Sequence, residues 1–300
     1  MGPMYHKPVL LQASVAGLGI KDDGIYVDVT FGGGGHSREI LKHLGNEGKL
    51  FAFDQDEDAL ENTIDDERFT LINENFRFVK QFLKFYGIRK VDGILADFGV
   101  SSHQFDTGER GFSTRFEADL DMRMSKRNTL SAYDVVNKYG YDDLRKVFFL
   151  YGDLRNANAM ANTILEQRSQ ESIKTTERLK QVLQKFLPKG REHKVLAQIY
   201  QAIRIEVNQE IAVIKEFLLQ MPDLLEEGGR LSIISYHSLE DRLVKRFIRA
   251  GQFEGEPEKD FYGNVEVPFK KVGSLIVPSK EEVAKNNRAR SAKLRIAERV

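Results

Sequence analysis

The chain has 300 residues, and its 45 basic and 45 acidic side chains leave no formal net charge, so it is not a polycation. It contains no cysteine, which excludes disulfides, thiolate metal sites and cysteine nucleophiles. No apolar run approaches the roughly 20 residues that a membrane span needs, and the N-terminus lacks the apolar segment of a secretory signal. We therefore expect a cytoplasmic protein with no membrane partner.

A glycine run, Gly32–Gly35, is the first chemical signal along the chain, and it stands between a short apolar strand and a helical pattern. Glycines let the backbone approach a ligand closely, and the N-terminus of the following helix presents free N–H groups. Asp54 ends the next apolar strand, where an acid can accept hydrogen bonds from both hydroxyl groups of a ribose. This order predicts a nucleotide-type binding unit; the alternative is a merely flexible turn.

Short apolar segments alternate with helical patterns through the first third of the chain. These predicted strands are Ile25–Thr30, Leu50–Asp54, Phe69–Ile72 and Val91–Asp97. The alternation predicts an α/β fold with a parallel sheet. Asp28, Asp54 and Asp97 lie at or near the strand ends, where ligands of such sheets bind. Each acid could instead cap the turn that follows it, but three together favour a binding edge.

The alternation stops near residue 106, and the pattern then stays polar and helical up to residue 197. We expect residues 106–197 to form an inserted helical domain. Residues 1–105 and 198–300 are expected to form one discontinuous core around it.

Apolar residues from Leu196 to Leu218 repeat at spacings of three and four, which predicts one continuous amphipathic helix along the sheet. The core resumes at a predicted strand, Arg230–Ser235. Lys271–Val277 and Leu294–Ala297 are expected to add edge strands in antiparallel orientation.

Asp97 opens a run of hydrogen-bonding residues that includes Ser101, Ser102 and Gln104. Asp97-Phe98-Gly99 matches the Asp-Phe-Gly motif of protein kinases, but the other kinase motifs are missing. The glycine run is not a phosphate loop of the Walker type, because His36-Ser37 replaces its lysine and hydroxyl residue.

His237 follows the strand Arg230–Ser235, and the sequence leaves three roles open for it: a general base, an RNA contact, or a histidine satisfied within the fold. A Ser-His-acid hydrolase fits poorly, since Gly-x-Ser-x-Gly is absent and no acid partner can be assigned. The six histidines form no closely spaced pair, so we expect no metal site.

Basic residues gather in three clusters. They are Arg123, Lys126 and Arg127; Arg242, Lys245, Arg246 and Arg249; and Lys285, Arg288, Arg290, Lys293, Arg295 and Arg299. Such clusters suit a polyanionic partner through phosphate contacts. Taken alone, any one of them could equally be an ordinary solvated face.

Ordered motifs along nearly the whole chain resemble the MraW/RsmH family. They are His6–Leu11, Gly35–Ser37, Asp97–Ser102, Gln104, Arg110–Ser113, Leu120–Met124, Arg204–Asn208, His237–Arg242 and Asn287–Ala292. The family's members are S-adenosylmethionine-dependent methyltransferases that act on the N4 amine of a cytidine in the decoding region of small-subunit ribosomal RNA. The chain departs from the family pattern after His193, where the usual Pro-Ala-Thr-Arg is absent, and at Gln55 and Phe98.

The resemblance implies a Rossmann-like methyltransferase fold, in which a mostly parallel sheet carries helices on both faces and an inserted helical domain recognises RNA. It implies an S-adenosylmethionine site made of Gly34, Gly35, His36, Asp54, Phe76, Asp97 and Gln104. By itself, Phe76 would be read as a core residue.

For the reaction, we expect Asp97, with Ser101, Ser102 and His237, to contact the target amine. The expected RNA contacts are Arg242, Lys245, Arg246, Arg288, Arg290 and Lys293. The absence of cysteine opposes methylation at carbon 5 of cytosine, which usually proceeds through a covalent cysteine adduct.

The expected partner is small-subunit ribosomal RNA, in an assembled or nearly assembled subunit, and the sequence leaves a homodimer open. Two other classes share features with this chain. An NAD-dependent oxidoreductase shares the glycine turn and the ribose acid, and a non-catalytic RNA-binding assembly factor shares the basic clusters.

Overall fold

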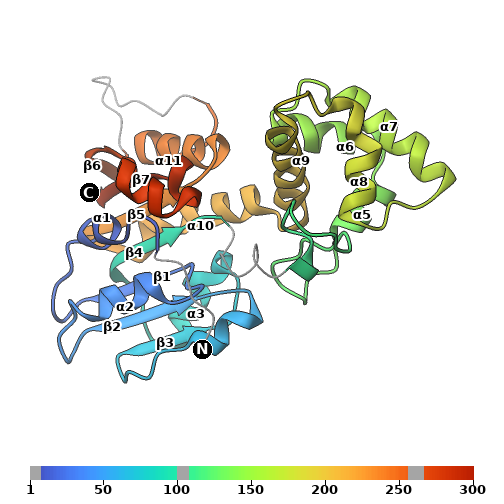
Figure 1. Cartoon of the computed structure of the whole chain (residues 1–300). Helices are drawn as coiled ribbons and strands as arrows, with labels where there is room; N and C mark the ends of the chain where they lie inside the picture. Colours follow the sequence, from blue (N-terminus) through green and yellow to red (C-terminus); the bar gives the residue numbers. More distant parts are fainter. Residues whose placement is uncertain (1–7, 100–107, 256–266) are drawn as a thin grey trace. The chain divides into compact units, whose positions relative to one another are not determined.

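The computed structural model describes residues 8–99, 108–255 and 267–300 (Figure 1). The chain forms two compact units, residues 1–99 with 211–300 and residues 100–210. The first is an α/β unit and the second is helical. The expected division fell at residues 105 and 198, whereas the second unit includes the whole of helix α9 (Glu192–Val207).

A seven-stranded sheet forms the centre of the α/β unit, with the strand order β3-β2-β1-β4-β5-β7-β6. Its strands are β1 (Ile25–Asp28), β2 (Lys49–Phe53), β3 (Phe69–Ile72), β4 (Val91–Asp97), β5 (Leu225–Ser235), β6 (Phe269–Ile276) and β7 (Lys293–Arg299). The first five are parallel to one another, and β7 runs antiparallel to both β5 and β6. This mixed sheet confirms the expected α/β, Rossmann-like fold.

Helices cover both faces of this sheet because the strands are apolar on both sides. Along β2, Leu50 and Ala52 pack into one core cluster, while Phe51 and Phe53 pack into another, as the two-residue period of a strand requires. The first cluster includes α1 (Leu11–Ala16) and α2 (Gly35–Leu41); the second includes α3 (Val79–Phe85), α10 (Glu210–Leu224) and α11 (Ser238–Ala250).

Six of the seven predicted strands are confirmed to within two residues at each end, whereas β5 begins at Leu225, five residues before the expected Arg230. One strand also differs in placement. Both C-terminal strands were expected at the edge, but only β6 lies there, and β7 is inserted between β5 and β6. The remaining short elements of this unit are η1 (Glu57–Asn62), η2 (Phe76–Phe78), α12 (Lys280–Lys285) and η6 (Asn287–Ser291). No helix in the described parts of the chain combines the length and apolarity needed to cross a bilayer.

The helical unit packs around its own apolar core. Its elements are η3 (Gly108–Arg110), α5 (Ala132–Lys138), α6 (Tyr141–Lys146), a π-helical turn η4 (Val147–Tyr151), α7 (Ala157–Gln170), α8 (Thr176–Leu183), η5 (Gln184–Phe186) and α9. Phe148, Ile164, Leu179 and Ile203 are among its fully buried side chains. Because this core shares no residue with the clusters around the sheet, the unit has the organisation of a separate insertion.

One continuous helix from Leu196 to Leu218 was expected, and this expectation is wrong. The helix ends at Val207, and α10 begins at Glu210. Between them Gln209 adopts a positive φ of 51°, a conformation that interrupts an α-helix. The apolar spacing runs through this break because Ile203 is buried in the helical unit and Leu218 is buried against the sheet.

Deletion of residues 286–300 is expected to unfold the α/β unit, because it removes β7, which pairs with two neighbours inside the sheet. Thermal unfolding followed by circular dichroism should then show no cooperative transition for this unit. The control is Arg290→Ala, which changes an exposed side chain of η6 and should unfold as the unaltered protein does. Native-like cooperative unfolding of the deletion would contradict this role of β7.

Candidate functional site

The glycine turn joins β1 to α2 in the conformation that only glycine adopts without strain. Gly34 has a φ of 74°, and a Cβ atom there would lie 2.3 Å from Nη1 of Arg38. A Cβ atom on Gly35 would lie 2.1 Å from Cγ of Pro8. A side chain at either position would meet these atoms, so the packing of the turn itself favours glycine there.

Hydrogen bonds fix the turn from three sides. The N–H of Gly32 donates to Oδ2 of Asp54 at 2.8 Å. The carbonyl of Gly32 accepts a hydrogen bond from Nδ2 of Asn62 at 3.1 Å, and the carbonyl of Gly33 accepts one from Nη1 of Arg38 at 3.0 Å. The turn is therefore preorganised and not merely flexible.

Asp54 lies directly after β2, as expected for the ribose-binding acid. Its two carboxylate oxygens each accept one backbone N–H, from Gly32 and from Asp56, both at 2.8 Å. A carboxylate oxygen has a second lone pair, so both oxygens can still accept a hydroxyl hydrogen. Burial raises the pKa of Asp54 to about 6, against the lowering effect of these two hydrogen bonds.

Asp97 ends β4 and lies close to two groups of the β1–α2 segment. Its N–H donates to Oγ1 of Thr30 at 2.7 Å, and its Oδ2 lies 3.9 Å from Nδ1 of His36. Burial raises the pKa of Asp97 to about 6; His36 and the hydroxyl of Tyr236 oppose this rise, and Asp28 adds to it.

Asp28 is the third acid of this edge, and it is completely buried. It accepts a hydrogen bond from Oγ of Ser37 at 2.7 Å and another from the N–H of Thr30 at 3.1 Å. Burial raises its pKa, while nearby His36 lowers it. The structure thus brings Gly34, Gly35, His36, Asp54 and Asp97 together with Asp28 at the carboxyl end of the parallel strands.

This edge has the charge and shape for a cationic nucleoside ligand. Three carboxyl groups share a poorly solvated region, so a positive ligand gains more from them than it would in water. The open backbone of the glycine turn and the acid after β2 suit the ribose end of such a ligand. S-adenosylmethionine combines a ribose with a positively charged sulfonium, so the residues present fit this group.

Phe76 lies in η2, and its ring stacks on Phe98 with the centroids 5.9 Å apart. It also meets Phe217 edge-on at 5.3 Å. The side chain is only partly buried, although it packs against the core beneath α10. These contacts agree with the core interpretation and leave part of the ring open to a ligand.

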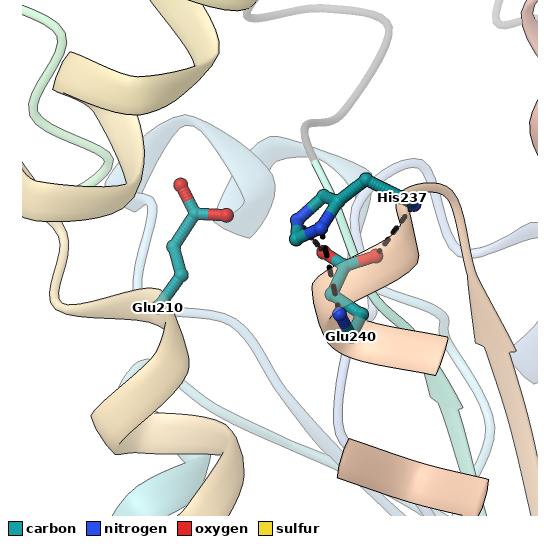
Figure 2. A group of neighbouring side chains, drawn as sticks. All are labelled: Glu210, His237 and Glu240. Atoms are coloured by element: carbon teal, nitrogen blue, oxygen red, sulfur yellow. Dashed lines mark hydrogen bonds and ion pairs between the residues drawn. The ribbon is translucent and has the colours of Figure 1, made fainter. Parts of the chain in front are cut away.

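His237 caps the N-terminus of α11, and both its ring nitrogens face Glu240 (Figure 2). Nδ1 accepts the N–H of Glu240 at 3.4 Å, and Nε2 lies 2.8 Å from Oε1 of the same residue. Glu240 is fully buried, and its Oε2 accepts the N–H of Tyr236 at 2.8 Å. The capping contact gives His237 a structural role at the start of α11, although its buried Nε2 has an ion-pair contact and no hydrogen bond in the described structure.

The six predicted RNA contacts are divided among α11, η6 and β7. Arg242 and Lys245 are exposed on α11, whereas Arg246 of the same helix donates to the carbonyl of Gly255. Lys293 of β7 lies 3.2 Å from Oδ2 of Asp241. Arg290 is exposed in η6 and Arg288 is partly buried there.

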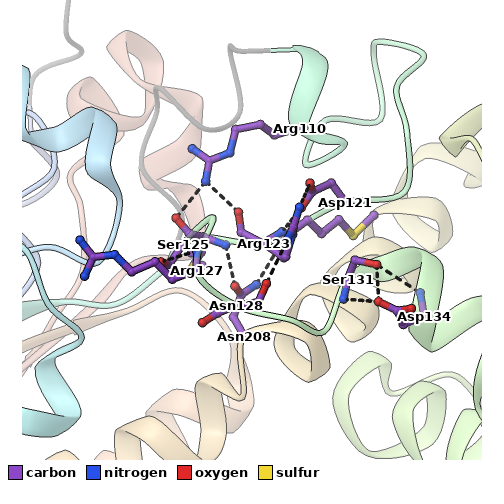
Figure 3. A network of polar contacts seen from close by, with 11 residues as sticks. Arg110, Asp121, Arg123, Ser125, Arg127, Asn128, Ser131, Asp134 and Asn208 are labelled. Carbon is purple, nitrogen blue, oxygen red and sulfur yellow. Dashed lines mark hydrogen bonds and ion pairs between the residues drawn. The ribbon is translucent and has the colours of Figure 1, made fainter.

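Three of the family-like motifs meet inside the helical unit (Figure 3). The guanidinium of Arg123 is bound by both carboxylate oxygens of Asp121, at 2.9 and 2.8 Å. Asn208, at the end of α9, accepts the N–H of Met124 at 2.7 Å and donates to the carbonyl of Met122 at 2.8 Å. Arg110 donates to the carbonyl of Arg123 at 2.7 Å. These motifs therefore build a fixed loop.

Ser101, Ser102 and Gln104 lie outside the described residues. Three residues of the α/β unit were not assigned from the sequence: Thr30, which accepts the N–H of Asp97; Tyr236, whose hydroxyl donates to Asp97; and the buried Glu240. Tyr236 lies directly after β5, so its place at a strand end was the available signal. No comparable signal marks Glu240, since a glutamate in a helical pattern is usually solvated.

The motif resemblance is confirmed by comparison with known proteins. The model of the MraW methylase family matches residues 3–300. A protein named ribosomal RNA small subunit methyltransferase H from Flavobacterium johnsoniae is 70% identical over 296 residues, which cover 99% of this chain and 98% of that protein. Proteins of the same name from Christiangramia forsetii and Cytophaga hutchinsonii are 68% and 56% identical, each covering 99% of this chain and 98% and 100% of their own lengths. This chain therefore belongs to the MraW methylase family and is an S-adenosylmethionine-dependent methyltransferase.

Proposed function

We propose that the chain transfers a methyl group from S-adenosylmethionine to the exocyclic N4 amine of a cytidine in the decoding region of small-subunit ribosomal RNA. The observation that carries this proposal is the group of three carboxyls around the glycine turn, which suits a sulfonium donor; Asp28 is fully buried, and Asp54 and Asp97 are partly buried. The relatives' name, ribosomal RNA small subunit methyltransferase, supports the class of RNA. The oxidoreductase and the non-catalytic assembly factor are excluded by membership of a methylase family.

The residues at this edge suit an amine nucleophile. The lone pair of a cytosine amine is conjugated into the ring, so the amine attacks weakly unless its N–H groups are held by acceptors. An acceptor there favours a pyramidal nitrogen and stabilises the positive charge that develops on it. Asp97 can supply such an acceptor, and the cysteine that carbon-5 methylation usually requires is absent from the chain.

Each group has a distinct part in this proposal. The Gly34–Gly35 turn and Asp54 hold the nucleoside part of the donor, with Phe76 and Gln104 completing the site. His36 and Asp97 lie beside its charged end, and Asp97, with Ser101 and Ser102, contacts the target amine. When bound, S-adenosylmethionine supplies an electrophilic methyl group. Holding nitrogen, methyl and sulfur in line accounts for up to about 7–11 kcal/mol in well-oriented reactions.

The target cytidine must leave its stack to reach this edge, at a cost of a few kcal/mol. In this proposal the helical unit and six basic residues bind the RNA. These residues are Arg242, Lys245, Arg246, Arg288, Arg290 and Lys293. An assembled or nearly assembled subunit is the proposed substrate, because a folded RNA presents phosphates to several separated clusters at once. A homodimer stays open.

Asp97→Asn is expected to lower the single-turnover rate of methyl transfer by about 100-fold or more, because it replaces a charged acceptor by a neutral one. The rate is measured on small subunits that lack the modification, and the product is mapped by mass spectrometry of the digested RNA. His237→Ala should lower the melting temperature, since it removes the cap of α11, and should change the rate less than Asp97→Asn does. Unaltered rates in both variants would remove Asp97 and His237 from the site.

Donor affinity is expected to fall as the pH drops through 6. A cationic donor binds the ionised form of Asp54, whose pKa burial raises to about 6, and protonation below that pH removes the attraction. This one group makes binding about tenfold weaker at pH 5 than at pH 7.5. Titration calorimetry across this range measures the effect, and Asp54→Asn should weaken binding at pH 7.5 and flatten the curve. Affinity that is constant from pH 5 to pH 8 would contradict this role.

The double variant Arg242→Ala, Lys245→Ala is expected to weaken RNA binding and to make it less dependent on salt. Each lost phosphate contact lowers the slope of log affinity against log salt by about 0.7–0.9. Lys49→Ala is the control, since it removes an exposed cation at the start of β2, at the amino end of the parallel strands. If the double variant binds RNA like the control at every salt concentration, α11 is not an RNA contact.

A further inference from the structure

Tyr236 links the end of β5 to the carboxylate of Asp97. Its hydroxyl donates to Oδ1 of Asp97 at 2.8 Å. Its own N–H donates to Oε2 of Glu240 at 2.8 Å, which ties the residue to the first turn of α11. A Cβ atom added to Gly99 would lie 3.2 Å from the Tyr236 ring, so the ring also packs against the backbone that follows β4.

We infer that Tyr236 is a positioning residue for methyl transfer, whose hydroxyl holds Asp97 in its charged form and in one orientation. The inference rests on the proposed role of Asp97. With Oδ1 bound by Tyr236, Oδ2 is the oxygen directed toward His36, at 3.9 Å. Tyr236 thereby selects which carboxylate oxygen faces the donor and the target amine.

The charges around Asp97 explain why this carboxylate needs a hydrogen-bond donor. Asp28 of β1 and Glu240 of α11 are acids that raise the pKa of Asp97, and burial raises it further. His36 of α2 opposes them from 3.9 Å, beyond hydrogen-bond distance. Within the described part of the chain, Tyr236 is the one side chain that donates a hydrogen bond to this carboxylate.

The phenol is suited to this task because it keeps its proton. Burial and the neighbouring carboxyls of Asp97 and Glu240 raise the pKa of Tyr236 well above its ordinary value. The hydroxyl therefore keeps its proton more firmly than an ordinary tyrosine and can donate it in a hydrogen bond to the ionised carboxylate. A hydrogen bond to a carboxylate stabilises the ionised form, so it acts against the burial that would otherwise leave Asp97 protonated.

Tyr236→Phe separates the hydroxyl from the ring, which keeps its packing. Removing the donor raises the pKa of Asp97, so the acidic limb of the profile of kcat/KM against pH should move upward by about one unit. The variant should lose about fivefold in kcat/KM near pH 6 and close to tenfold at about pH 5, and recover most of the loss by pH 8. Its melting temperature at pH 8 should stay close to that of the unaltered protein. An unmoved limb together with an unchanged titration of Asp97, or an equal loss at every pH, would overturn the inference.

Tyr139→Phe is the matched control. Tyr139 also donates to a carboxylate, Oε1 of Glu206 at 2.7 Å, but it lies in the helical unit. This variant should leave the acidic limb in place, and a shift equal to that of Tyr236→Phe would show that the effect is not local to Asp97.

A second measurement keeps this inference distinct from the proposed function. The titration of Asp97, followed by NMR in protein with labelled aspartate carboxyls, should shift upward in Tyr236→Phe whatever the substrate is. A shift in the NMR titration with no change in the kinetic profile would mean that the hydroxyl holds Asp97 but that Asp97 does not act in the reaction. Unchanged titration would overturn the inference itself.

Discussion

The site depends on carboxyl groups that are buried beside a glycine turn and kept there by backbone hydrogen bonds. Asp54 illustrates the constraint: it accepts the N–H groups of Gly32 and Asp56, and these bonds hold the turn in the shape that positive φ values at Gly32 and Gly34 require. Without Asp54 the N–H of Gly32 would lose its acceptor. A Cβ atom on Gly34 would lie 2.3 Å from Nη1 of Arg38. The same residues thus determine the conformation of the β1–α2 segment and the shape of the surface that it offers to a ligand.

Burying these acids has a cost in folding that favours ligand binding. A rise in the pKa of Asp54 to about 6 corresponds to about 3 kcal/mol of lost stability at neutral pH, and Asp97 adds a similar term. A cationic ligand offsets this loss by pairing with the ionised carboxylates. At the proposed donor site, part of the binding energy would then come from a charge interaction that the free protein lacks.

The sheet was predictable because strand period and strand ends are local properties. Alternation along β2 and the acids at the ends of β1, β2 and β4 are visible in the sequence, and the structure brings these acids to one edge of the sheet. The position of β7 was not predictable, since its pairing with β5 joins residues such as Leu231 and Ala297, far apart in the chain. The break at Gln209 was missed because apolar spacing continues across it. The break depends on a backbone angle and on hydrogen bonds of the Asn208 side chain, and neither alters the pattern.

Residue type alone misleads most where a side chain acts on its neighbour and not on substrate. His237 has the chemistry of a general base, but its ring caps α11 and pairs with Glu240, which in turn fixes the backbone of Tyr236. Tyr236 then binds Asp97. His237 is thus linked to Asp97 through Glu240 and Tyr236, and the effect proposed for it on the reaction is geometric.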